Sequence, residues 1–368
     1  MAEIQIRQLR KSFSDFVAVK SSSMVLQDGK FVVLLGPSGC GKTTTLRMIA
    51  GLEYPTSGQI MLDGVDVTYR RPRERDIAMV FQLFALYPHM GVRDNLEFPL
   101  RNEGLPRDQI ERRVREVAEI LRIEHLLDSR IGGLAGGDRQ RVALGRAIVR
   151  QPKAFLMDEP LGTLDAEFRE IMCLELRKLH DRLKTTTVFV THDQNEAMAL
   201  ADHIVVMNNG QILQADDPQG IYDFPRCVFV AKFIGRPPMN LLELRAPLEA
   251  GADQVDLGGT VVKVPRVLAG SDRALLGVRP EHVRLGSADH GLPAQVARVE
   301  YFGSHWIAEL DTPAGAIKAL VDKSVRPREG ERMGLTFDAK RIVMFDAASE
   351  QLLASATTSQ HQASMFHG

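Results

Sequence analysis

The run Phe31-Val32-Val33-Leu34-Leu35-Gly36-Pro37-Ser38-Gly39-Cys40-Gly41-Lys42-Thr43 contains the pattern that decides the fold. Its five apolar residues predict a buried strand, and the octet Gly36–Thr43 has the spacing Gly, four residues, Gly-Lys-Ser/Thr. The apolar stretch Leu46–Leu52 predicts a helix that follows the octet. A strand, a glycine-rich turn and a helix in this order are typical of a phosphate-binding loop in an α/β domain.

The octet combines residue types that suit a nucleoside triphosphate and its metal ion. The glycines let backbone N–H groups converge on phosphate oxygens, Lys42 would contact the β and γ phosphates, and Thr43 would place its hydroxyl on Mg²⁺. The competing interpretation, a purely structural glycine-rich turn, is disfavoured by the motif described next. The predicted nucleotide-binding residues are Gly36, Pro37, Ser38, Gly39, Cys40, Gly41, Lys42, Thr43 and Thr44.

Two adjacent carboxylates follow a second strand-like run. Ala154-Phe155-Leu156-Met157 predicts the strand, and Asp158 and Glu159 come directly after it. Because ligands of open α/β sheets gather at such strand ends, we expect both carboxylates near the octet. Asp158 would hold Mg²⁺ through its water shell, and Glu159 would orient or deprotonate the water that attacks the γ phosphate.

The composition of the 368 residues excludes several other classes of protein. A formal net charge of −1 provides no global field for a polyanion, so we expect no nucleic-acid partner. The longest apolar runs fall far short of the roughly 18 residues that cross a bilayer. Three cysteines without clustered spacing predict neither a disulfide framework nor a zinc site, and they are typical of a cytoplasmic protein.

Composition and the pattern of apolar residues divide the chain into three parts. Alternating strand-like and helix-like stretches over 1–235 predict an α/β domain around a largely parallel sheet. Arg236-Pro237-Pro238 interrupts regular structure, and the short β-prone runs after it predict a small all-β barrel or sandwich over 236–346. Residues 347–368 are rich in Ala, Ser, Thr, Gln and His without periodicity, and we expect a flexible tail there.

Four further motifs surround the octet and the carboxylate pair. They are Gln82 after the apolar run 78–81, Leu134-Ala135-Gly136-Gly137-Asp138, Leu164-Asp165, and His192 after the strand-like run 188–190. In this order and spacing the motifs resemble those of the ATPase subunits of ABC transporters. The resemblance implies a P-loop ATPase domain with a helical subdomain at about 88–153, and ATP and Mg²⁺ as cofactors.

The resemblance also implies a role for each motif. Gln82 matches the Q-loop glutamine, which would bind Mg²⁺ together with Thr43 and Asp158, and His192 matches the switch histidine. The implied catalytic residues are Glu159, His192 and Gln82, the implied D-loop is Leu164-Asp165, and the implied signature is Leu134, Ala135, Gly136, Gly137 and Asp138. Phe13 stands where the family has an aromatic ring that stacks on adenine, and a structural anchor of the first hairpin is the alternative role for Phe13 or Phe16.

Within this family the chain is similar to carbohydrate-type importer ATPases, such as those for maltose and glycerol phosphate. Ala85–Met90, Pro238-Met239-Asn240 and Gly277–His282 carry this likeness, which spans about 1–346. It implies that the β domain is OB-like, pairs two subunits and can receive regulatory signals. A structural ion pair between Arg279 and Glu281 is at least as well supported by the residues alone.

The implied partners follow from the same likeness. Two ATPase subunits would face each other, with each ATP between one octet and the other signature, so that binding closes the dimer and hydrolysis reopens it. Two membrane permeases would sense this motion, with Phe84, Leu86 and Tyr87 as candidate docking contacts or, equally, core residues. An extracytoplasmic solute-binding protein completes the complex, and the subunit would lie peripherally on the cytoplasmic face of the membrane.

The signature departs from the family pattern at two positions. Ala135 replaces the usual Ser, which removes a hydroxyl aimed at the γ phosphate, and Asp138 would add mild repulsion. Each ATP site would combine an octet from one subunit with a signature from the other, and in this chain the octet is intact whereas the signature is weakened. The sequence therefore slightly favours a heterodimer with a second ATPase subunit over a homodimer. The transported solute would be a sugar, polyol, glycerol or glycerol phosphate.

Three alternatives stay open at this point. The first is that the chain serves a polyamine or metal importer, and the second is that it acts as a weakly hydrolysing regulatory ATP-binding subunit. A soluble ABC protein that remodels ribosomes or DNA is disfavoured, because the chain has one phosphate loop and no sustained heptads.

Overall fold

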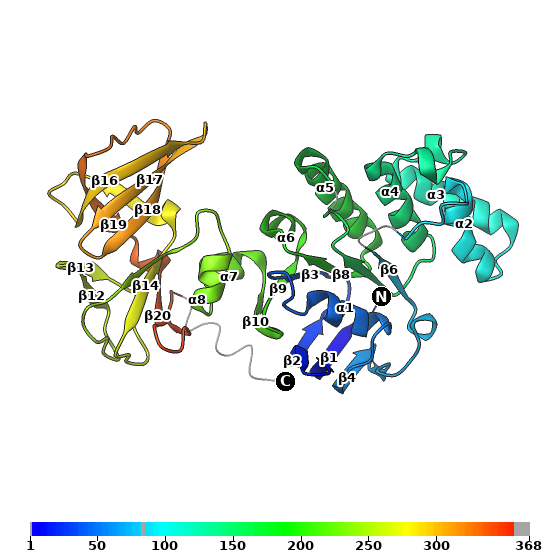
Figure 1. Ribbon diagram of the computed structural model, residues 1–368, viewed down its shortest axis with the longest axis horizontal. Helices are drawn as coiled ribbons and strands as arrows, with labels where there is room; N and C mark the ends of the chain where they lie inside the picture. Colours follow the sequence, from blue (N-terminus) through cyan, green and yellow to red (C-terminus); the bar gives the residue numbers. More distant parts are fainter. Residues whose placement is uncertain (1, 82–84, 163, 357–368) are drawn as a thin grey trace. The chain divides into compact units, whose positions relative to one another are not determined.

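The structure is a computed structural model, and it describes residues 2–81, 85–162 and 164–356 (Figure 1). The chain divides between Pro218 and Gln219 into two compact units. The sequence predicted a division at 235, whereas helix α8 (Val228–Phe233) lies in the second unit and helix α7 (Pro218–Asp223) lies there from Gln219 onward. Packing explains the difference, because Val228 and Ala231 share a buried cluster with Phe345 near the end of the chain.

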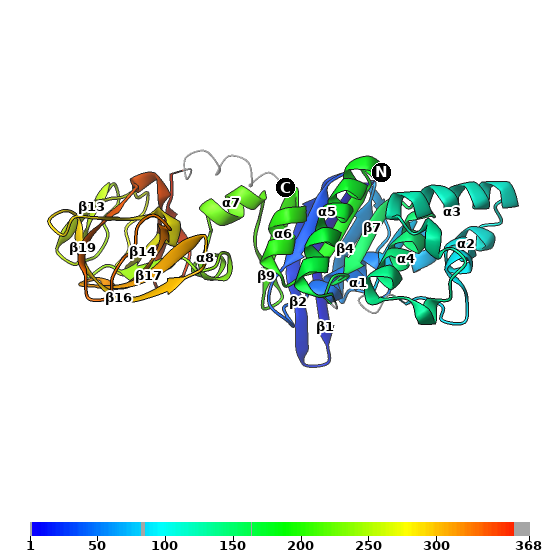
Figure 2. The same cartoon turned by 90° about the horizontal axis from the view of Figure 1, so that it is seen from above.

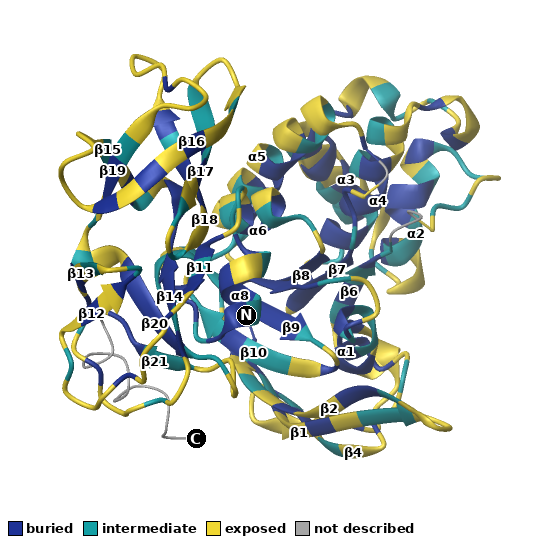
Figure 3. Ribbon diagram, turned by 60° about the vertical axis from the view of Figure 1, so that its left-hand side comes forward, coloured by how far each residue is buried: buried dark blue, intermediate teal, exposed yellow. Residues whose placement is uncertain are grey.

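The first unit is built around a six-stranded sheet in the order β10-β9-β3-β8-β7-β6. Strands β9, β3, β8, β7 and β6 run parallel to one another, and β10 pairs antiparallel with β9. Every residue of β3, β7 and β8 is buried, as expected for strands that are covered on both faces (Figure 3). The strands are β3 (Phe31–Leu35), β6 (Ile77–Val80), β7 (Ala154–Asp158), β8 (Thr186–Thr191), β9 (His203–Asn208) and β10 (Gln211–Asp216).

A second, antiparallel sheet in this unit has the order β2-β1-β4-β5. The strands are β1 (Ile4–Phe13), β2 (Phe16–Leu26), β4 (Ser57–Leu62) and β5 (Val65–Asp66). Ile4, Ile6 and Leu9 of β1 join the same buried cluster as Val32 and Leu34 of β3. The two sheets therefore share one core, which holds the phosphate loop at its edge.

The helices of the first unit are α1 (Lys42–Ala50), α2 (Val92–Asn102), α3 (Arg107–Leu121), α4 (Gly136–Ile148), α5 (Ala166–Leu183) and α6 (Gln194–Leu200). Helices α2, α3 and α4 gather beside the sheet as a helical group (Figure 2). They meet at Gly145, where an added Cβ would lie 2.8 Å from Leu96, 3.1 Å from Leu121 and 3.3 Å from Val117. Helix α3 buries one face, which carries Ile110, Val114, Val117, Ala118 and Leu121.

A buried arginine fixes the end of α1. Arg75 is 1% exposed, and its guanidinium donates to the carbonyls of Met48 and Ile49 at 2.7 and 2.8 Å, and to those of Thr68 and Arg70 at 2.9 and 3.0 Å. The first two carbonyls belong to the last turn of α1, where the Met48 carbonyl also accepts from the backbone N–H of Gly51 at 3.1 Å. Arg75 therefore joins α1 to the loop that precedes β6.

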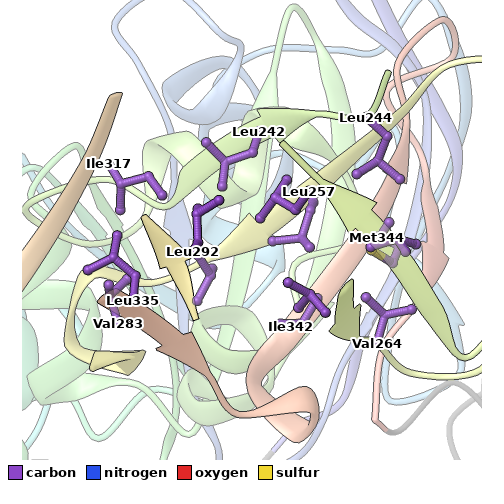
Figure 4. Packing of buried hydrophobic residues seen from close by; sticks show 14 of the residues in the cluster. Leu242, Leu244, Leu257, Val264, Val283, Leu292, Ile317, Leu335, Ile342 and Met344 are labelled. Carbon is purple, nitrogen blue, oxygen red and sulfur yellow. The ribbon is translucent and has the colours of Figure 1, made fainter. Parts of the chain in front are cut away.

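The second unit is an all-β fold with two antiparallel sheets, in the orders β11-β14-β20-β21 and β15-β19-β16-β17-β18, and a separate β12-β13 hairpin. Its strands are β11 (Asn240–Glu243), β12 (Gln254–Leu257), β13 (Thr260–Lys263), β14 (Ala274–Val278), β15 (Val283–Gly286), β16 (Leu292–Tyr301), β17 (His305–Thr312), β18 (Gly315–Asp322), β19 (Arg332–Phe337), β20 (Ile342–Asp346) and β21 (Leu352–Ala354). Figure 4 shows Leu242, Leu292, Leu335 and Ile342 from different strands in one core. Strand β21 lies inside the segment that the sequence predicted to be a tail, because Leu352 pairs with Phe345 of β20.

Arg279 attaches the two short helices to this β fold. It is 1% exposed, and it donates to the carbonyl of Tyr222 at 2.9 Å and to that of Ile234 at 2.6 Å. Its guanidinium carbon also lies 3.7 Å from the centre of the Tyr222 ring. The alternative of an Arg279–Glu281 pair is replaced by a different arrangement, in which Glu281 accepts a 2.6 Å hydrogen bond from the hydroxyl of Tyr222.

Candidate functional site

The glycine-rich loop between β3 and α1 is shaped by contacts that leave no room for side chains. An added Cβ at Gly36 would lie 2.2 Å from the carbonyl oxygen of Met207, and one at Gly41 would lie 2.5 Å from that of Ala18. Gly41 also has a φ of +101°, which favours glycine. At Gly39 an added Cβ would meet nothing within 4 Å, so the loop faces open space there. Thr44 follows in the first turn of α1 and is half-buried.

Lys42 is buried although it carries a charge. It is 4% exposed, and its Nζ donates to the carbonyl oxygens of Gly36 at 2.8 Å and of Pro37 at 2.9 Å. These two carbonyl groups hold the ammonium group against its own loop. An oxyanion that entered the loop would offer this ammonium a stronger, charge-assisted partner.

The loop and the first carboxylate meet directly. The hydroxyl of Thr43 donates to Oδ1 of Asp158 at 2.7 Å, as the sequence predicted for two residues near one metal ion. Burial raises the pKa of Asp158, and the Thr43 hydrogen bond and the charges of Arg47 and Lys42 act against this rise. A buried carboxylate next to a hydroxyl is an oxygen donor set that suits Mg²⁺, which commonly uses one or two carboxylates together with substrate phosphates. Gln82, the other predicted ligand, lies outside the described residues.

The second carboxylate faces the histidine that the sequence paired with it. Oε2 of Glu159 lies 3.4 Å from Nδ1 of His192. Glu159 has a φ of +45°, and its backbone N–H donates to the carbonyl of Val190 at 3.1 Å, so the end of β8 fixes this unusual conformation. The side chain of Glu159 is 21% exposed and that of His192 is 57% exposed, which leaves both groups accessible.

The signature residues form the N-terminus of α4. Ala135 is the N-cap residue and makes no side-chain capping bond, and Leu134 before it is buried. An added Cβ at Gly136 would meet nothing within 4 Å, whereas one at Gly137 would lie 2.2 Å from the ring of Phe168. The free backbone N–H groups of this helix end therefore stay available to an anion.

Asp138 is not the free negative charge that the sequence suggested. Its carboxylate forms an ion pair with Arg141, one turn later on α4, and the two side chains are about a quarter exposed. An ion pair at this spacing offsets most of the field that Asp138 would otherwise direct at a phosphate. The predicted repulsion is correspondingly smaller.

The D-loop residues lead into α5. Leu164 is buried, and Asp165 is the N-cap of α5, where its side chain accepts a 2.9 Å hydrogen bond from the backbone N–H of Phe168. Phe168 also contacts Gly137, as described above, so the D-loop helix and the signature helix touch. No motif in the sequence indicates this contact, because the apolar ring occupies an ordinary helical position.

Phe13 lies at the end of β1, opposite Phe16, and is 44% exposed. Nζ of Lys11 lies 4.6 Å from the centre of its ring. The next strand, β2, touches the phosphate loop at Ala18, so the hairpin and the loop are neighbours. The exposed ring is available for stacking, which agrees with the predicted role without testing it.

A groove of about 340 Å³ lies between β6 and the helical group. It is lined by Met79, Tyr87, Phe98, Arg146 and Arg150, among others. Of the three candidate docking residues, Tyr87 lines the groove, Leu86 is half-buried, and Phe84 lies outside the described residues. The sequence analysis missed Arg146, which donates to the carbonyl of Ala85 at 2.8 Å and lies 5.0 Å from the ring of Tyr87.

No helix among the described ranges is long and apolar enough to cross a membrane.

The chain matches the family model for ABC transporters over residues 19–162 and the model for the TOBE domain over 276–345. A dimeric bacterial ABC transporter cassette shares 29% sequence identity and a TM-score of 0.54 with this chain, covering 59% of this chain and 99% of that one.

Several relatives match along nearly their whole length. The osmoprotective compounds uptake ATP-binding protein GgtA of Synechocystis is 44% identical, over 95% of this chain and 99% of the relative. The sn-glycerol-3-phosphate import ATP-binding protein UgpC of Cereibacter sphaeroides is 45% identical, over 96% and 100%. The trehalose/maltose import ATP-binding protein MalK of Thermococcus litoralis is 44% identical, over 94% and 98%.

Proposed function

Because the chain belongs to the ABC transporter family, as an ATP-binding subunit of an import system with a C-terminal TOBE domain, we propose that it powers the uptake of a carbohydrate, polyol, glycerol or glycerol-phosphate-like solute. Subunits of this kind hydrolyse ATP to drive transport. The solute class rests on the relatives, whose names include sn-glycerol 3-phosphate, trehalose and maltose. These names do not favour the polyamine or metal alternative.

The observation that carries the proposal is the meeting of five side chains at one edge of the sheet. Lys42 closes the loop, Thr43 is bonded to Asp158, and Glu159 faces His192. We assign the phosphates of ATP to the backbone N–H groups of 36–44 and to Lys42, and the adenine ring to Phe13. When bound, Mg²⁺ would neutralise charge on the phosphate oxygens, and Thr43, Asp158 and Gln82 are the residues that would hold it.

The catalytic step then falls to Glu159 and His192. Glu159 orients the attacking water and accepts its proton, and His192 holds the Glu159 carboxylate on one side while its exposed ring faces the γ phosphate. The strained backbone of Glu159 keeps this carboxylate apart from that of Asp158, so the two neighbours perform separate tasks. Gln82 would complete the site.

We further propose that two copies of this chain form the ATPase dimer. The sequence slightly favoured a heterodimer because its signature looked damaged. Two observations weaken that reason: Asp138 is paired with Arg141, and the helix N-terminus at Gly136 is open. The comparisons give no support for a second, non-identical ATPase. Intact mass measurement of the purified transporter is expected to find one ATPase species present twice, and two different species would contradict the homodimer.

The groove beside Tyr87 is the site we propose for docking of the permeases. Its mixed lining of aromatic rings and the guanidinium groups of Arg146 and Arg150 suits a short helix that carries both apolar and acidic residues. Docking here would hold the subunit peripherally at the cytoplasmic face, and a solute-binding protein would act on the other side. Crosslinking of a Tyr87→Cys variant to cysteines in the cytoplasmic loops of the permeases checks this placement.

Glu159→Gln in the assembled transporter tests the proposed function. We expect ATP hydrolysis and solute uptake to fall by about 100-fold or more, because a positioned general base typically contributes 10²–10⁴-fold, while ATP binding is retained. The weakly hydrolysing regulatory subunit is the competing function. It predicts that the complex keeps its ATPase activity after this substitution.

A further inference from the structure

Arg169, in the first turns of α5, contacts two separate segments of the nucleotide site. Its Nη2 donates to the carbonyl oxygen of Leu164 in the D-loop at 3.0 Å. Its Nη1 donates to Oδ2 of Asp193 at 3.2 Å, and its Nε lies 3.3 Å from Oε1 of Glu196. One guanidinium group therefore joins the D-loop to the segment that follows His192.

Residues 191–196, which Arg169 contacts through Asp193 and Glu196, are held together by hydrogen bonds of their own. Thr191 donates from its hydroxyl to Oε2 of Glu196 at 2.6 Å, and it accepts from the backbone N–H of Asp193 at 3.0 Å. Asp193 in turn caps α6 through Asn195 and Glu196. His192 stands inside this closed unit, so a displacement of its backbone would displace the acceptors of Arg169.

The environment of Glu196 shows that the arrangement depends on charge. Glu196 is 4% exposed, and burial raises its pKa, while the Thr191 hydrogen bond and the charges of Arg169 and His192 lower it. A buried carboxylate left without its cation is costly, and it tends to take up a proton instead. Removal of Arg169 would therefore loosen Glu196 as well as the D-loop.

We infer that Arg169 is a positioning residue that couples the D-loop at Leu164 to the His192 segment, so that a change in one segment is transmitted to the other. The inference rests on the proposed function, because the coupling affects turnover only if Glu159 and His192 carry out hydrolysis. Phe168 of the same helix also touches Gly137 of the signature, so in the proposed dimer this coupling links the two ATP sites.

A second arginine on the same helix provides a matched control. Arg177 also joins α5 to the end of α6, which lie side by side in Figure 1 and Figure 2. It donates to the carbonyl oxygen of Leu200 at 2.9 Å and lies 3.0 Å from Asp202. Its side chain is 31% exposed, against 28% for Arg169, and its partners Leu200, Asp181 and Asp202 lie outside both the D-loop and the His192 segment.

The test compares Arg169→Met, Arg169→Lys and Arg177→Met in the assembled transporter. For Arg169→Met we expect kcat to fall by about tenfold or more, in the range of typical coupling between sites. KM for ATP should stay within about twofold, because no contact to the nucleotide is removed. The Hill coefficient for ATP should fall toward one. Arg169→Lys keeps the charge but cannot contact Leu164, Asp193 and Glu196 at once, so it should recover part of kcat.

Arg177→Met should lower the unfolding temperature by a similar amount and leave kcat within about twofold, because it removes packing and ion pairs of the same kind. The inference is overturned if Arg169→Met keeps kcat within twofold, or if both methionine variants lose kcat in proportion to their loss of stability. Glu159→Gln in the same complex distinguishes failure of the proposed coupling from failure of the proposed function. If Glu159→Gln abolishes hydrolysis and Arg169→Met does not affect it, only the coupling fails; if Glu159→Gln has no effect, the proposed function fails.

Discussion

The hydroxyl of Thr43 donates to Oδ1 of Asp158 over 2.7 Å, across 115 residues of sequence. This bond joins the first turn of α1 to the end of β7. It holds the two proposed metal ligands together before any cation arrives, and it lowers the pKa of a carboxyl group that burial alone would raise. The fold thus brings two of the three proposed metal ligands together in advance.

Replacement of Thr43 by Val keeps the volume of the side chain and removes the hydroxyl. We expect Mg²⁺-dependent ATP affinity to fall by about 10- to 100-fold, because the variant lacks one of the oxygen ligands proposed for Mg²⁺. Binding in the presence of EDTA should change little. Fluorescence titration with a labelled ATP analogue, with and without Mg²⁺, measures both quantities. Thr43→Ser should restore the wild-type affinity, and equal losses with and without Mg²⁺ would argue against a metal role for Thr43.

The signature offers a prediction with a built-in control. Ala135 is an N-cap residue without a capping side chain, so Ala135→Ser and Ala135→Asp should both stabilise α4 by about 0.5–2 kcal/mol. Only the serine also offers a neutral hydroxyl to a γ phosphate in the dimer. ATP hydrolysis by the transporter should therefore rise about tenfold in Ala135→Ser, and fall in Ala135→Asp because of charge repulsion. A similar rise in both variants would show that helix stability, and not phosphate contact, limits turnover.

The buried contacts of Arg279 should contribute strongly to the stability of the second unit. Arg279→Met should lower the free energy of unfolding of this unit by about 2–4 kcal/mol, because buried carbonyls of Tyr222 and Ile234 lose their donor. Arg341→Met removes an ion pair with Asp223 whose arginine is 43% exposed, and it should cost less than about 1 kcal/mol. The chain has a single tryptophan, Trp306, which lies in β17, so its fluorescence during urea unfolding reports on this unit. Equal losses in the two variants would contradict the assigned role of Arg279.

The thiol of Cys173 should be unreactive over the whole working pH range. Burial, together with the charges of Glu196 and Asp193, raises its pKa to about 12. Because the thiolate is the reactive form and the neutral thiol is favoured in the folded state, alkylation at pH 9 should be about a thousandfold slower than for an ordinary thiol. Pulsed labelling with iodoacetamide and mass spectrometry of the peptides checks this. The urea-unfolded chain is the control and should label quickly.

The sequence predicted those parts of the site whose chemistry resides in side chains at strand ends. The octet and Asp158 each follow a buried strand, and parallel strands bring their carboxyl ends to one edge, so their meeting could be foreseen. The same reasoning located Glu159 and His192 after β7 and β8. The predicted strands at 31–35 and 154–157 are confirmed for the same reason, because fully buried strands are marked by unbroken apolar runs.

The sequence could not indicate contacts in which a side chain binds a backbone carbonyl. A pair of Arg279 with Glu281 was one of two interpretations of the sequence, whereas Arg279 binds the carbonyls of Tyr222 and Ile234. Arg169 bonds the carbonyl of Leu164 and was missed altogether. Every residue has a carbonyl group, so such partners leave no mark in the sequence, and only the fold shows which of them come within reach.

Arg75 shows what such a contact implies for local motion. Its guanidinium closes the last turn of α1 and the loop before β6 at the same time. Neither segment can open without breaking the bonds of the other, so their amide protons should exchange with solvent as one cooperative group. The last turn of the helix that begins at Lys42 and the loop before β6 should therefore share a single opening event in the native protein.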